Sequence, residues 1–134
     1  MNYKLEKKEL IGTCALLIHA AKIDDNYQET EKKIILSFIK KTNSETEKPE
    51  LILNEAEKAE KDSNQLINFT NIIKKNSLTS KSIVVKELWK IIISDKNVDE
   101  YESNLIRRIC GLIYFPDKLS GEIKLKLINE LKSK

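Results

Sequence analysis

The sequence predicts an all-α protein, and three observations lead to that class. Apolar residues recur at helical spacing along most of the 134-residue chain, from Leu10 to Leu131. Gly, Pro and aromatic residues are sparse and charged residues make up 34%, which is typical of charged helical domains rather than strand proteins. A short phrase occurs twice: an apolar run ending in Asp, a polar turn, and a Glu seven residues after that Asp. We therefore expect one domain, residues 1–134, of about seven helices in two pseudo-repeated helix-turn-helix halves.

Four helices are predicted in the first half of the chain. The first covers residues 3–23, and a turn at 24–28 precedes the second, where Gln28 stands three residues before Glu31 in a capping-box pattern. Pro49 falls in the first turn of a third, very acidic helix, where proline is tolerated. The expected apolar sides of the four helices are Leu10, Cys14, Leu17, Ile18 and Ala21; Ile34, Ile35, Phe38 and Ile39; Leu51, Leu53 and Ala56; and Leu66, Ile67, Phe69, Ile72 and Ile73.

Three more helices are predicted in the second half. Thr79 is expected to cap the fifth, which runs to about Ser94, and Asp99 with Glu102 forms a stronger capping box at the sixth. Pro116 is expected to stop the sixth helix, and a last amphipathic helix covers residues 119–131. The expected apolar sides of the fifth and sixth helices are Val84, Val85, Leu88, Trp89, Ile92 and Ile93, and Leu105, Ile106, Ile109, Leu112 and Ile113, with Trp89 buried against first-half helices near Leu17 and Phe38.

Charge and composition exclude several classes of function. The net charge of +3 is small and the signs are interspersed, so we expect no nucleic-acid partner. The charged N-terminus lacks the features of a signal peptide, and no apolar run approaches the roughly 20 residues of a membrane span. We therefore expect a cytoplasmic protein, with Cys14 and Cys110 as buried thiols. The lysine-rich stretch 118–134 is expected to be a solvated face, and weak contact with an anionic membrane surface is the alternative.

The duplicated phrase also supplies the candidate site residues. Asp24, Glu31, Asp95, Asp99 and Glu102 stand at equivalent points of the two halves. If the halves pack about a pseudo-twofold axis, these carboxylates gather on one edge and attract Ca²⁺ or Mg²⁺, which prefer oxygen ligands. The simpler alternative is that they cap helix N-termini. Capping does not explain Asp24 and Asp95, because both end their helices, so these two are the stronger candidates.

Other catalytic arrangements find little support in the sequence. His19 is the single histidine, which excludes a multi-histidine metal site within one chain, and we expect it on a half-buried or exposed helix face. Neither cysteine belongs to a CxxC pair, and no Gly-rich phosphate loop or Ser-His-Asp set is present. The expectation is therefore a protein that is not an enzyme.

The two phrases, Ala21 to Glu31 and Leu88 to Glu102, carry a family resemblance. Their order, spacing and duplication resemble the tellurite-resistance TerB-like family, which includes the N-terminal domain of a membrane-anchored DnaJ-type co-chaperone, and the resemblance spans about residues 10–112. This chain departs from the family pattern where Asp25 and Lys96 replace a turn Gly. The resemblance implies an all-α fold and a bacterial, cytoplasmic protein of stress or tellurite resistance, without established catalysis.

The expected function is a non-enzymatic interaction module with a protein partner and a weak divalent-cation site at the paired acidic turns. Two alternatives stay open: a metal-dependent enzyme that uses the same carboxylates, and a purely structural subunit. Perturbed carboxylates in a cleft would favour the enzyme, and an exposed apolar patch would favour the interaction module.

Overall fold

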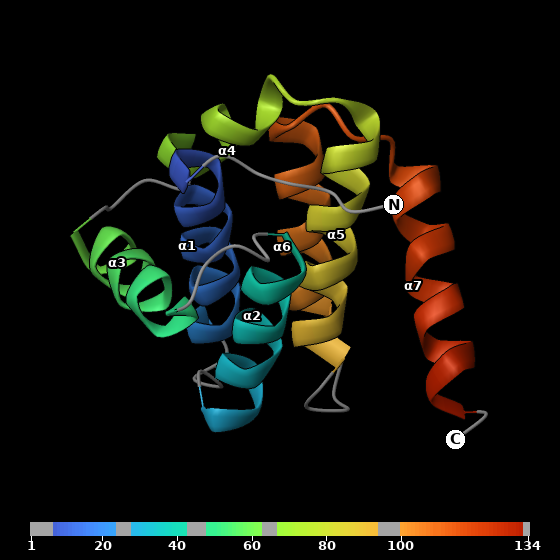
Figure 1. Ribbon diagram of the computed structural model, residues 1–134. Helices are drawn as coiled ribbons and strands as arrows, with labels where there is room; N and C mark the ends of the chain where they lie inside the picture. Colours follow the sequence, from blue (N-terminus) through green and yellow to red (C-terminus); the bar gives the residue numbers. More distant parts are fainter. Residues whose placement is uncertain (1–6, 24–27, 43–47, 63–66, 94–99, 133–134) are drawn as a thin grey trace.

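The computed structural model describes residues 7–23, 28–42, 48–62, 67–93 and 100–132, which form helices and the short turns between them. No strand occurs within these ranges, so the predicted all-α class is confirmed. No helix in them has the length and apolarity that a membrane span requires. Their seven helices are α1 (Lys7–Ile23), α2 (Glu29–Thr42), α3 (Pro49–Asp62), α4 (Ile67–Lys74), α5 (Leu78–Ile93), α6 (Glu100–Leu112) and α7 (Asp117–Lys132) (Figure 1).

Two helices, α1 and α5, form the centre of the bundle. They lie side by side and run in the same direction, so both end at the lower end of the molecule in Figure 1. The helices α2, α3 and α4 pack on α1, and α6 and α7 pack on α5. α3 and α7 therefore lie on opposite sides of the molecule.

The apolar pattern explains why α1 is central. Residues 12–18 are all buried, because this stretch is apolar or small on every side, and a helix that is apolar all round is stable only inside a fold. The outer helices bury one face each. The predicted burial of Cys14 and Cys110 is confirmed, and both are free thiols.

Two predicted core residues are exposed instead. Leu51 of α3 is 55% exposed and Ile67 of α4 is 44% exposed. In α3 the buried residues are Pro49, Ile52, Leu53, Ala56 and Glu60, which follow the helical period and leave Leu51 on the solvent side. The apolar type of Leu51 suggested burial, but the buried face lies elsewhere on the helix.

The starts of three helices test the predicted caps. The amide of Gln28 donates to the Glu31 Oε1 atom at 2.9 Å, which confirms the capping-box contact at α2. Pro49 is the first residue of α3, as predicted. The predicted cap Thr79 is wrong, because Ser77 Oγ accepts a hydrogen bond of 3.2 Å from the amide of Ser80 and therefore caps α5.

The end of α6 differs from its prediction as well. Tyr114 has a φ of 60°, in the left-handed region, and the amide of Phe115 donates to the Cys110 carbonyl at 2.8 Å. This Schellman turn ends α6 at Leu112, before the chain reaches Pro116. The carbonyl of Pro116 then accepts from the amide of Ser120, so α7 begins at Asp117, two residues earlier than predicted.

Trp89 is buried, as predicted, and its polar contacts come from α7. The side chain is 4% exposed. Its Nε1 atom donates to Ser120 Oγ of α7 at 3.0 Å, and the Lys124 ammonium, also on α7, lies 5.0 Å from the ring centroid. These polar contacts tie α5 to α7, and the packing of Trp89 near Leu17 and Phe38 stays a prediction.

Candidate functional site

The predicted acidic site is only partly within the described ranges. Asp24, Asp95 and Asp99 lie outside them, and Glu102 belongs to α6 with its side chain outside the described part. Glu31 lies in α2 and is buried, with 5% of its surface exposed. Its carboxylate accepts a hydrogen bond from the Gln28 amide and so has a structural role at the start of α2. That Glu31 forms a cation site together with the other four predicted carboxylates stays a prediction.

The ends of the two central helices lie at the same end of the bundle. Ile23 ends α1 and Ile93 ends α5, and both residues immediately precede the acidic turns of the duplicated phrase. Because α1 and α5 are adjacent and run in the same direction, these two ends lie on one side of the molecule (Figure 1). In the described ranges, no group of three or more His, Cys, Asp or Glu side chains is arranged to hold a metal ion.

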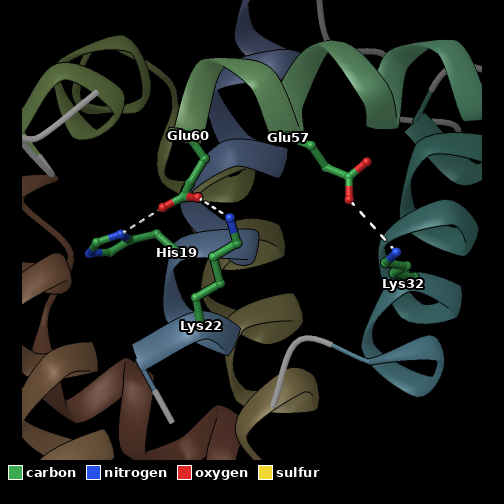
Figure 2. A network of polar contacts seen from close by, with 5 residues as sticks. All are labelled: His19, Lys22, Lys32, Glu57 and Glu60. Atoms are coloured by element: carbon green, nitrogen blue, oxygen red, sulfur yellow. Dashed lines mark hydrogen bonds and ion pairs between the residues drawn. The ribbon is translucent and has the colours of Figure 1, made fainter. Parts of the chain in front are cut away.

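A different polar cluster joins α3 to α1 (Figure 2). Glu60 of α3 accepts a hydrogen bond of 2.7 Å from Lys22 Nζ through Oε1, and its Oε2 atom lies 3.3 Å from His19 Nδ1. The Glu60 side chain is 11% exposed, whereas those of His19 and Lys22 are 35% and 43% exposed. The half-buried position of His19 agrees with its prediction.

The electrostatics of Glu60 follow from burial and its two partners. Burial by itself raises the pKa of this carboxyl, because it disfavours the charged form. The hydrogen bonds from Lys22 and His19, together with the charges of these residues, outweigh burial and hold the pKa of Glu60 below its ordinary value. Glu60 is thus a buried carboxylate held in its ionised form by partners on a neighbouring helix.

A weaker ion pair joins α3 to α2. Lys32 Nζ lies 3.9 Å from Glu57 Oε2, and about one third of each side chain is exposed. Figure 2 shows Glu57 and Glu60 on the same helix, reaching toward α2 and α1 respectively. The acidic character of α3 therefore serves in part to fasten the helix to its two neighbours.

The sequence analysis did not find the cluster of His19, Lys22 and Glu60. The available signal was the spacing of His19 and Lys22, which puts them on one face of α1, since residues three apart are neighbours on a helix. Nothing local pairs that face with Glu60, which is 38 residues beyond Lys22. The role of this cluster is structural, because it joins α3 to α1. The His19 imidazole contacts the Glu60 carboxylate, whose charge Lys22 already neutralises.

Both cysteines are poor nucleophiles in this fold. Burial raises the pKa of Cys14 far above its ordinary value, and the nearby Glu87 carboxylate raises it further. The pKa of Cys110 is raised to about 11, chiefly by burial; a hydrogen bond with Ser120 lowers it in part, and the Asp117 charge adds a smaller rise. Since the thiolate is the reactive form, neither thiol has the environment of a catalytic cysteine.

An apolar groove runs between α5 and α7. One hollow of about 380 Å³ is lined by Leu78, Phe115, Leu119 and Ile123 among others, and a second of about 160 Å³ continues it past Ile83 and Leu127. Ser82, Ile123 and Lys126 line both hollows, so they belong to one continuous surface, which we call the α5–α7 groove. Glu122 and Lys126 border the first hollow, and Lys86, Lys126 and Glu130 border the second.

Comparison with known proteins assigns the chain to a family. No curated protein and no solved structure matches it. A family model described as tellurite resistance protein TerB matches residues 10–125, which is most of the chain and includes both copies of the acidic phrase. The chain belongs to the TerB family of tellurite resistance proteins.

Proposed function

We propose that this TerB domain is a non-enzymatic interaction module of a bacterial tellurite-resistance or stress-response system. In this role it docks a partner protein in the α5–α7 groove and carries a weak Ca²⁺ or Mg²⁺ site at the paired acidic turns. The observation that carries the proposal is the groove itself, a continuous apolar surface with room for side chains of another protein. Leu78 on its border is 53% exposed, although it is a large apolar residue.

The net positive charge of the two helices that form the groove favours an acidic amphipathic helix as the partner segment, while at the border itself Lys86 and Lys126 balance Glu122 and Glu130. α5 has three lysines and one glutamate, and α7 has four lysines and three acidic residues, so both helices carry net positive charge. Lys126 borders both hollows and Lys86 borders one, so both ammonium groups can meet carboxylates on the polar side of a docked helix. Apolar side chains of that helix fill the hollows, and complementary charge selects the partner and its orientation.

The test of the groove uses two residues of α7 that differ in position. Ile123 lines both hollows, whereas Leu125 is 62% exposed and lines neither. A photo-crosslinking residue at position 123 should capture an acidic amphipathic segment in bacterial cells, and one at position 125 should not. A synthetic peptide of that segment should bind the purified chain, and Ile123→Asp or Lys126→Glu should weaken it at least about tenfold, while Leu125→Asp should not. Equal weakening by Leu125→Asp would reject the groove as the docking site.

The cation part of the proposal rests on the adjacent ends of α1 and α5, which precede the two acidic turns. Millimolar Ca²⁺ or Mg²⁺ should raise the melting temperature, because a ligand bound only to the folded state stabilises it by mass action. Asp95→Asn should remove this response more completely than Asp99→Asn, since the sequence predicts a capping role for Asp99 and none for Asp95. No heat and no thermal shift up to roughly 10 mM would reject the site. Cation-dependent turnover of a substrate that Asp95→Asn abolishes would instead support the metal-dependent enzyme.

A further inference from the structure

A second pocket, separate from the α5–α7 groove, lies where α6 and α7 meet Trp89 of α5. Its volume is about 230 Å³, and the residues that matter for its chemistry are Trp89, Arg107, Asp117, Ser120 and Lys124. It shares no lining residue with the two hollows of the groove. Drug-sized ligands occupy pockets of roughly 300 Å³ or more, so this one suits a smaller molecule.

The indole of Trp89 is held in place at this pocket. Its Nε1 atom donates to Ser120 Oγ at 3.0 Å, and both side chains are almost fully buried, at 4% and 5% exposure. Burial and the hydrogen bond together fix the ring plane, so the wall it presents is preformed. At 4% exposure the indole presents little of its surface, and the Lys124 ammonium lies over its ring, so a ligand meets a small, fixed part of Trp89 beside Lys124.

Two cationic side chains border the pocket, and neither has a carboxylate partner among the described residues. Arg107 of α6 is exposed, and its guanidinium makes no hydrogen bond or ion pair in the part of the chain that the structure describes. The Lys124 ammonium lies over the indole at 5.0 Å and has no carboxylate partner among the described residues. Asp117 supplies one opposing charge at the pocket, so its lining has a net charge of +1.

We propose that this pocket binds a small organic anion with a small apolar body and one phosphate or carboxylate group. The guanidinium of Arg107 presents parallel donors that match the oxygen atoms of such a group, and Lys124 adds a second positive charge. The apolar body fills the pocket beside the small part of the fixed indole that remains accessible. The Asp117 carboxylate opposes the ligand's charge and weakens binding, but the lining keeps a net charge of +1, which attracts an anion.

The single tryptophan gives this proposal a direct readout. The indole N–H of Trp89 produces the one tryptophan side-chain resonance of the chain, and it lies at the pocket. Titration of the full chain with phenyl phosphate at constant ionic strength should shift this resonance in a saturable way. Phenol, which has the ring without the charge, should bind at least about tenfold more weakly. Inorganic phosphate, which has the charge without the ring, should also bind more weakly.

Arg107 and Arg108 form a matched pair of test and control. Both are exposed on α6, but only Arg107 lines the pocket. Arg107→Gln should weaken phenyl phosphate about tenfold or more, because a charged hydrogen-bond donor is lost, and Arg108→Gln should leave the affinity within about twofold. Asp117→Asn should tighten binding, because it removes the opposing charge.

Gly121→Leu provides a variant that blocks the pocket without threatening the fold. Gly121 of α7 is exposed and lines the pocket. No atom lies within 4 Å of a Cβ atom added there, and leucine has a higher helix propensity than glycine. This variant should abolish the shift of the Trp89 resonance. Three results would overturn the proposal: no saturable shift up to roughly 10 mM, an equal loss in Arg108→Gln, or equal binding of phenol. None of these results would bear on partner docking in the α5–α7 groove, which has different residues.

Discussion

The carboxylate of Glu60 on α3 accepts a hydrogen bond of 2.7 Å from the ammonium group of Lys22 on α1. The buried apolar side chains of α3 are Ile52, Leu53 and Ala56, and Ala59 near its end is only partly buried. Glu60 is near the other end of the helix and is the buried residue that fastens that end to α1. The pair therefore helps to hold this end of α3 against α1.

Glu60→Gln should destabilise the protein by about 1–2 kcal/mol in urea unfolding. The amide keeps the size of the side chain but loses the charge that Lys22 and His19 stabilise, and the 43% exposure of Lys22 limits the loss. Glu57→Gln is the control, since its pair with Lys32 is longer, at 3.9 Å, and more exposed. The control should change stability by no more than about 0.5 kcal/mol. Equal losses in the two variants would contradict the special role of Glu60.

The stability difference between the wild type and Glu60→Gln should depend on pH. The pKa of Glu60 in the folded protein is below its ordinary value of 4.5, because Lys22 and His19 outweigh the effect of burial. A carboxyl with a depressed folded-state pKa contributes stability that is complete above the unfolded-state pKa. That contribution is lost as the pH falls through the lower, folded-state pKa. Urea unfolding at pH 6 and at stepwise lower pH should show the difference shrinking only below 4.5, and a difference that grows toward acid would reverse this conclusion.

Trp89→Ala should cost roughly 3–5 kcal/mol, because it empties the space of a large side chain that is 4% exposed. Trp89→Phe should cost less, since it keeps an aromatic ring and loses mainly the hydrogen bond to Ser120. Ser120→Ala removes the other partner of that bond, so the two substitutions combined should cost less than the sum of their separate effects. Thermal and urea unfolding give the stability of the wild type, Trp89→Ala, Trp89→Phe, Ser120→Ala and the Trp89→Phe/Ser120→Ala double variant. An unchanged melting temperature in Trp89→Ala would contradict the burial of Trp89.

Tyr114→Gly should be more stable than Tyr114→Ala by about 1 kcal/mol in thermal unfolding. The backbone of Tyr114 has a φ of 60°, which glycine adopts without the steric cost that a Cβ atom imposes. Both variants lose the ring, which lies 5.2 Å from Lys74 Nζ and 6.0 Å from Lys81 Nζ. The comparison therefore isolates the backbone conformation, and a more stable alanine variant would show that the left-handed turn is absent in solution.

The sequence by itself determined the helical class and the positions of most helices. These features depend on local rules that act within a few residues: apolar periodicity for α1 and α5, proline at the first position of α3, and the contact of Gln28 with Glu31 at α2. Local rules failed where two neighbouring residues compete for one role. Ser77 rather than Thr79 caps α5, and the turn at Tyr114 ends α6 before Pro116 does.

Only the tertiary structure decided which faces and charges meet. The pairing of Glu60 with Lys22, the exposure of Leu51 and the contact of Trp89 with Ser120 depend on how helices far apart in the sequence pack together. Residue type determines whether a side chain tends to be buried, but long-range packing selects its neighbours, because one helix face has several possible partners of similar apolar character. The pocket beside Trp89 belongs to this second class, since its residues come from three helices whose arrangement no local pattern specifies.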